Sequence, residues 1–165
     1  MTAGVGQLQI SQIATQDDVT AVKADIDRLQ TTQTAIQADV AIIRSTLSKL
    51  DARMQNTQLH IWNRTRLNAD VPRPLLMLHK VNEGNGNPLG ISANGSPSVQ
   101  DFIAGEIGEI FPMTGPEVVY PDLTHNIING MVYFYNDTMG ITPQDSISSR
   151  QARVRCWLVG SEPTP

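Results

Sequence analysis

The sequence has a single cysteine, Cys156, so no disulfide within the chain can stabilise the fold. Basic residues are also scarce, because 12 lysines and arginines stand against 16 acidic residues and the formal net charge is −4. A dedicated nucleic-acid-binding protein needs positive charge to neutralise phosphates. The charge therefore argues against nucleic acid as a partner. The lone Cys156 is expected to be a buried or half-buried thiol.

Long apolar runs are missing as well. No window approaches the roughly 18 consecutive apolar residues of a membrane span. The first residues, MTAGVGQLQISQIATQDD, lack the basic start and apolar core of a secretory signal. These absences favour a soluble intracellular protein, although a virion component or a protein exported by an unconventional route would show the same pattern.

Patterns typical of catalysis are lacking too. The histidines His60, His79 and His125 are isolated, without the spacing of a metal site. Neither a phosphate-binding loop with its lysine nor a Gly-x-Ser-x-Gly turn occurs. Glu106 and Glu109 could share a helical face, but they are expected to be ordinary surface carboxylates rather than a catalytic pair. We therefore expect no catalytic, cofactor-binding or metal-binding residues, and a protein that is not an enzyme.

What the sequence does contain is a sustained heptad repeat. With Val19 placed at position a, the spacing alternates between three and four residues without a slip for five heptads. Such a 3.5-residue repeat is typical of a left-handed coiled coil of roughly 60 Å, and less typical of one long core helix packed within its own chain. The expected oligomer interface comprises Val19, Val22, Ile26, Leu29, Gln33, Ile36, Val40, Ile43, Leu47, Leu50 and Met54.

The flanking charges and the seam residues predict the kind of oligomer. In a parallel arrangement, Asp18 meets Lys23 of the neighbouring chain and Asp39 meets Arg44, so both charged pairs attract. Isoleucine at d and leucine at a favour three strands over two, although a dimer stays open. The amide of Gln33 at an a position is expected to fix register and strand number at some cost in stability.

The domain organisation follows from where the repeat starts and stops. Acidic residues near Thr15–Asp18 favour a helix start there, and the helix is expected to fade between Asn63 and Asn68, ahead of a proline-rich block. We predict an α+β chain in three parts. They are a flexible segment at 1–14, a coiled-coil oligomerisation helix at 15–66 and a small mixed head at 67–165 with a long loop at 82–100.

The head contains several short expected elements. Arg73–Val81 is typical of a strand, and Gln100–Phe111 fits either a short helix or two brief strands. Asp122–Met139 has helical spacing and Gly140 as a stop, whereas Ser146–Val159 fits a helix or, over its second half, a strand. In the helical case Arg150, Arg153 and Arg155 are expected to face largely outward, where a polar or anionic partner is able to contact them.

The order of short motifs resembles a fungal family. The motifs are Arg64–Asn68, Pro74-Leu75, Phe111–Thr114, Phe134–Ile141 and Arg150–Gly160. With the coiled coil before them, they are similar to the meiotically up-regulated-type C-terminal domain proteins that mushroom-forming fungi encode. The sequence departs from that pattern by a longer insert at about residues 82–105. The resemblance implies an architecture, a coiled coil followed by a head, more than an activity.

Three functions fit these patterns. The first is a structural, self-assembling homo-oligomer whose coiled coil joins the heads into a rod, particle or filament. The alternative is a trimeric attachment fibre or spike with a β-rich head that binds a receptor or glycan. A weaker alternative is DNA binding through the three arginines.

Overall fold

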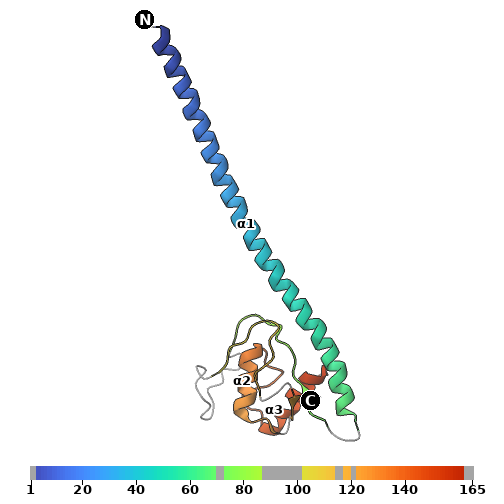
Figure 1. Ribbon diagram of the computed structural model, residues 1–165. Helices are drawn as coiled ribbons and strands as arrows, with labels where there is room; N and C mark the ends of the chain where they lie inside the picture. Colours follow the sequence, from blue (N-terminus) through green and yellow to red (C-terminus); the bar gives the residue numbers. More distant parts are fainter. Residues whose placement is uncertain (1–2, 70–72, 87–101, 114–116, 120–121, 162–165) are drawn as a thin grey trace. The chain divides into compact units, whose positions relative to one another are not determined.

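The computed structural model describes residues 3–69, 73–86, 102–113, 117–119 and 122–161 (Figure 1). It divides into two compact units, residues 1–44 and residues 45–165. The architecture is the expected α+β one, a long helix followed by a small domain that contains two helices and a two-stranded sheet. Its elements are α1 (Ala3–Leu67), β1 (Leu75–Leu76), β2 (Glu117–Val118), α2 (His125–Tyr135) and α3 (Ile147–Val159).

Helix α1 runs for 65 residues, and no proline interrupts it. It ends at Leu67, inside the interval expected for its end. It begins at Ala3 and not near Thr15, where the start was expected, while the flexibility expected of residues 1–14 stays a prediction. Acidic residues near a helix start help but are not required, and the residues before Thr15 contain nothing that forbids a helical backbone.

The sheet is smaller than the sequence suggests. The expected strand at Arg73–Val81 is reduced to Leu75–Leu76, which pairs antiparallel with β2, and an isolated bridge joins His79 to Ile110. Side chains of α1 bind the main chain of this segment in place of another strand, as described below. The β-rich head of the attachment alternative is therefore not found, since β1 and β2 are the only strands in the described part of the chain.

The segment before β2 is neither the helix nor the pair of strands expected for Gln100–Phe111. Its described part is irregular, and two glycines explain why. Gly105 lies so close to the ring of Phe134 that a Cβ atom there would overlap it, and Gly108 adopts φ +90°, a conformation that disfavours other residues. Both positions require glycine, and both prevent a regular element.

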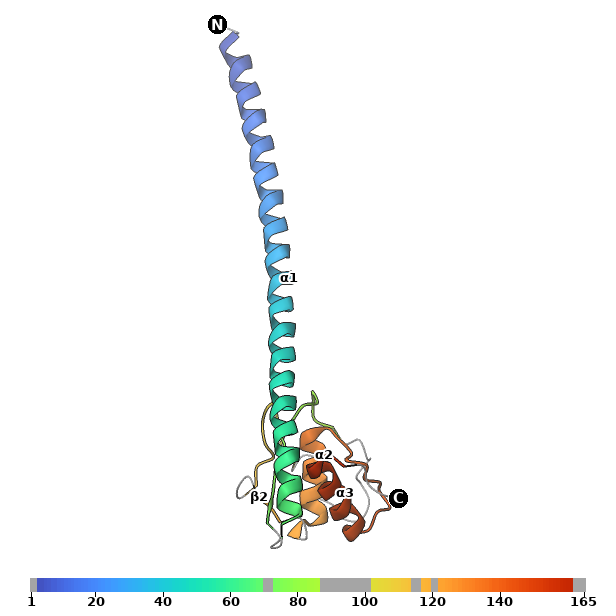
Figure 2. The same cartoon turned by 90° about the vertical axis from the view of Figure 1, so that its right-hand side faces the viewer.

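Helices α2 and α3 form the centre of the small domain, beside the C-terminal part of α1 (Figure 2). Helix α2 starts at the N-cap Thr124 and ends at Asn136, whose φ of 48° is left-handed. The expected stop at Gly140 is four residues late, because asparagine tolerates this conformation almost as well as glycine. Helix α3 confirms the helical alternative for Ser146–Val159, with Ser146 and Gly160 as its caps.

The core is built from one face of each helix and from the β1 segment. Ile147, Val154 and Leu158 of α3 turn inward as expected. The buried apolar residues are Leu75, Met77, Leu78, Val118, Leu123, Ile128, Met131, Val132, Phe134, Tyr135, Met139, Ile141, Val154, Leu158 and Val159.

Tyr135 makes this core sensitive to alkali. Its hydroxyl donates to Leu78 O (2.6 Å) and accepts from Phe111 N (3.1 Å). Burial raises the pKa of Tyr135 well above its ordinary value, and the hydrogen bond from Phe111 opposes this only in part. The folded protein therefore keeps this proton more tightly than the unfolded chain, so the stability it contributes is complete below about pH 10 and is lost as pH rises above it.

We expect the free energy of unfolding to fall as the pH rises above about 10, and to fall less steeply in Tyr135→Phe. Urea denaturation at several pH values measures both slopes. Tyr133→Phe, which removes the hydroxyl of a half-buried tyrosine two positions earlier, is the matched control. Equal slopes in Tyr135→Phe and in the unmodified chain would contradict this account.

Candidate oligomerisation surface

Within residues 45–165, the head packs on one face of α1. The α1 side chains that are buried or hydrogen-bonded there recur at intervals of four and three residues. In the heptad numbering most of them occupy f and c positions, on the side of the helix opposite a and d, and three near the end of α1 lie elsewhere: His60 and Leu67 at g and Arg64 at d. We call the f and c set the docking face; it comprises Ser45, Lys49, Ala52, Asn56, Leu59, Asn63 and Arg66.

Two asparagines, one heptad apart, attach the β1 segment to this face. Asn63 accepts from Leu76 N (2.7 Å) and donates to Leu76 O (2.8 Å). Asn56 does the same with His79, at 2.7 and 2.8 Å. An amide side chain can donate and accept at once, so each asparagine replaces the main-chain pairing that a neighbouring strand would supply. Asn63 is fully buried, and both amides are therefore structural.

The end of α1 also caps the end of α3. The last carbonyl groups of a helix have no hydrogen-bond partner within the helix. For α3, side chains of three α1 residues supply these partners. Asn63 donates to Leu158 O (2.8 Å), and His60 lies 3.0 Å from the same oxygen through Nδ1. Arg64 donates to the oxygens of Val159 and Gly160, each at 2.7 Å. This fixes the small domain to the α1 end by hydrogen bonds as well as by packing.

Near Ser45 the contact is ionic. Lys49 lies 2.7 Å from the Glu83 carboxylate, and Ser45 donates to it at 2.9 Å. These two hydrogen bonds and the positive charge of Lys49 lower the pKa of Glu83. The contact is solvent-exposed, so it orients the segment more than it stabilises it.

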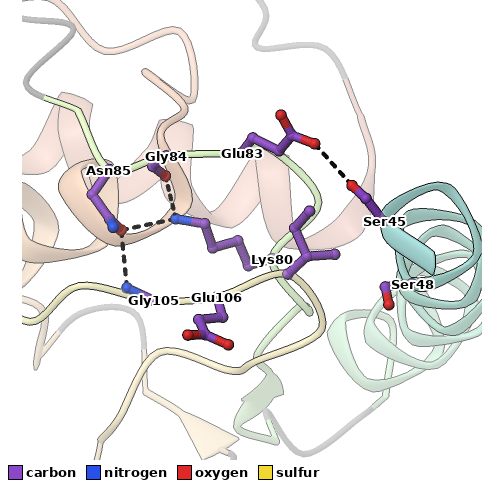
Figure 3. Close-up of a pocket in the computed structure, with 9 residues that line it drawn as sticks. Ser45, Ser48, Lys80, Glu83, Gly84, Asn85, Gly105 and Glu106 are labelled. Atoms are coloured by element: carbon purple, nitrogen blue, oxygen red, sulfur yellow. Dashed lines mark hydrogen bonds between the residues drawn. The ribbon is translucent and has the colours of Figure 1, made fainter. Parts of the chain in front are cut away.

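Beside this contact lies a polar pocket of about 400 Å³ (Figure 3). Lys80 lies in its wall, with its ammonium group directed at acceptors: Gly84 O at 2.6 Å, Asn85 Oδ1 at 2.8 Å, and Phe134 O. Burial lowers the pKa of Lys80, while the nearby Glu109 carboxylate opposes the shift. The three N–H groups of the ammonium match these three acceptors, so Lys80 links the end of α2 to the turn at Gly84 and Asn85.

The a and d positions of the same stretch of helix are left exposed. Leu47, Leu50, Met54 and Ile61 keep between 54% and 60% of their surface in contact with solvent, although the docking face a half-turn away is covered. The small domain therefore packs on α1 without covering these apolar a and d residues, and the one d residue that it contacts is the polar Arg64. In residues 45–67 the expected interface residues remain available for another chain.

Residues 1–44 show the same stripe on their own. The exposed fraction of the apolar a and d residues ranges from 39% at Val40 to 69% at Leu29, and Gln33 is exposed as well. Ile42, at a c position, is a further exposed apolar residue. We call the whole expected set, Val19, Val22, Ile26, Leu29, Gln33, Ile36, Val40, Ile43, Leu47, Leu50 and Met54, the seam. A helix of this length with such a stripe suggests coiled-coil oligomerisation.

The three arginines of α3 are placed differently from expectation. Arg150 is buried, contrary to the prediction that it faces outward: it donates to Asn129 Oδ1 (2.9 Å) and to Pro143 O (3.1 Å). Arg153 pairs with Asp145 at 3.1 Å, and Arg155 is half-buried. Arg150 is thus a structural link between α3, α2 and the segment that joins them, and this removes one of the three charges from the expected anion contact.

Other kinds of site find no support in the described residues. Nowhere among them do three or more His, Cys, Asp or Glu side chains gather in a way that could hold a metal ion. None of the described helices combines the length and apolar character needed to cross a membrane.

No family model, no curated protein and no solved structure matches the chain. The resemblance to the fungal family stays a prediction, and the functional argument depends on the geometry of α1.

Proposed function

We propose that this protein is a non-enzymatic, self-assembling structural protein whose copies associate in parallel through the seam. The observation that carries the proposal is the separation of two faces on one helix. In residues 45–67 the docking face takes the head of the same chain, and the a and d positions stay exposed. Because f and c positions lie outermost in a coiled coil, the heads do not obstruct the seam.

The free energy for association comes from the seam itself. Burying a large aliphatic side chain contributes roughly 1.5–3 kcal/mol, and the seam contains ten apolar residues that are exposed in one chain. Even after the entropy cost of association, this exceeds what a stable complex needs. A long exposed helix with such a stripe would otherwise promote nonspecific aggregation.

Parallel orientation is supported by the charges beside the seam. In register, Asp18 faces Lys23 of the next copy and Asp39 faces Arg44. Each exposed pair contributes only a few tenths of a kcal/mol. They select the orientation and register while the apolar residues provide the affinity.

A trimer is the favoured assembly. Ile36 and Ile43 occupy d positions and Leu47 occupies an a position, a combination that favours three strands over two. Gln33 then lies near the axis, where three amides are able to hydrogen-bond to one another or to trapped water. A polar a residue lowers stability and raises specificity of register and strand number.

Replacing Gln33 by isoleucine is expected to raise the melting temperature of the oligomer and to broaden its distribution of strand numbers. The reason is that the variant buries an apolar side chain where the amide was desolvated. Circular dichroism gives the melting temperature and native mass spectrometry the distribution. A clear drop in melting temperature would refute this role for Gln33.

A single-cysteine experiment tests orientation. In a Cys156→Ser background, Leu29→Cys places one thiol at a d position, where equivalent residues meet only if the chains are parallel and in register. Oxidation is expected to give disulfide-linked pairs of chains. Asp27→Cys, at an exposed b position, is the control that should remain unlinked. Linkage at Asp27 but not at Leu29 would exclude the proposed seam, and negative-stain microscopy would then distinguish discrete particles from filaments.

A further inference from the structure

The small domain does not cover α1 symmetrically. Around a heptad helix the positions follow the order a, e, b, f, c, g, d. Besides the f and c residues of the docking face, the head contacts His60 and Leu67 at g positions and Arg64 at a d position. The opposite flank, formed by b and e positions, carries exposed residues at Ser48, Asp51, Gln58, Trp62 and Thr65.

Trp62 stands out on this open flank. It is 62% exposed, although it is a tryptophan at a b position outside the seam. It borders a surface pocket of about 330 Å³ together with Leu59, Arg66, Leu76 and His79. Beside it, Ile61 at the next a position is 60% exposed. Large exposed aromatic residues of this kind are typical of protein–protein contacts.

In a parallel coiled coil, the e flank of one chain faces the g flank of the next. The g flank of this chain carries the head, where His60 contacts Leu158 O and packs against Gly160. Chains in register also place equal residue numbers at equal heights. Trp62 of one copy therefore lies at the same height as His60 and the end of α3 in the adjacent copy. It also lies on the flank of its own helix that faces that copy.

We propose that Trp62 of each copy packs against the head of the adjacent copy, on the surface formed by His60 and the C-terminal end of α3. This inference rests on the proposed parallel association, and it names a second contact that association through the seam creates. The contact is heterologous, since it joins one flank to the other, and it closes on itself in a cyclic oligomer. The heads then form a ring around the base of the coiled coil.

The test uses the full chain with Trp157→Phe, so that Trp62 is the only tryptophan. In the oligomer we expect its emission to shift to shorter wavelength and its quenching by acrylamide to fall, relative to the same chain dissociated by Ile36→Asp. Light scattering on the same samples gives the mass independently. An oligomer in which Trp62 is as accessible as in the dissociated variant would overturn the inference and leave the seam intact. A monomeric parent chain would overturn both.

A second variant measures the strength of the contact. Trp62→Ala in the full chain is expected to weaken association roughly 30-fold, the loss typical of a central interface aromatic. Gln55→Ala, at the preceding b position, is the matched control and should leave association unchanged. An unchanged association constant in Trp62→Ala would count against the inference.

Discussion

Replacing Ile36 by aspartate is expected to dissociate the oligomer into monomers. The substitution removes an apolar d residue whose burial contributes about 2 kcal/mol per chain, and it places carboxylates from every copy at one level of a dry seam. Bringing like charges together without water adds a penalty of several kcal/mol. Since each 1.4 kcal/mol changes an equilibrium constant tenfold, association should weaken by a factor of about 100 or more.

The matched control is Ala35→Asp, one residue earlier at an exposed c position outside the docking face. It introduces the same charge and loses more helix propensity than Ile36→Asp does, because alanine is a better helix former than isoleucine. Sedimentation equilibrium should show dissociation for Ile36→Asp alone. If both variants dissociate equally, helix stability rather than the seam explains the effect; if neither dissociates, the seam is misassigned.

Replacing Asn63 by alanine is expected to destabilise the small domain by about 3–5 kcal/mol, because Leu76 N and Leu76 O lose their buried partner and Leu158 O keeps only His60. For a domain of this size, that loss should lower the melting temperature by about 10–20 °C. Differential scanning calorimetry measures it directly. If Asn63→Ala does not fold at all, the near-ultraviolet circular dichroism signal will be lost. That result would equally support a structural role for the Asn63 side chain.

An exposed asparagine provides the control for this prediction. Asn126→Ala, in the first turn of α2, removes the same side chain from the surface and should change the melting temperature by less than about 2 °C. Equal effects of the two substitutions would show that the Asn63 contacts contribute nothing particular to the fold.

The seam could be predicted from the sequence because its signal is apolar and periodic. The docking face has the same 3.5-residue repeat, yet it could not be found in this way. Its members include Asn56, Asn63 and Lys49, which contact main-chain oxygens, main-chain nitrogens or a carboxylate instead of apolar side chains. Any coiled coil carries polar residues at its solvent-exposed f and c positions, so the sequence pattern alone does not distinguish an occupied face from a free one. Only the structure reveals that this surface is occupied.

The head was harder to predict for related reasons. Arg150 and Lys80 are charged residues that the sequence places on a surface or in a strand, but the structure buries both against backbone carbonyls at turns and helix ends. Such pairing depends on which segments meet in space. The strand expected at Arg73–Val81 failed for the same reason, since the amides of Asn56 and Asn63 replace its missing neighbour.

The mass of the intact chain in solution tests the central claim most directly. Light scattering across a range of concentrations should give a multiple of 18.0 kDa, with three copies as the favoured value. The helical signal should fall together with the mass on dilution. A mass of one chain at all concentrations, with the seam still helical, would contradict the proposal that the exposed seam joins copies of this protein.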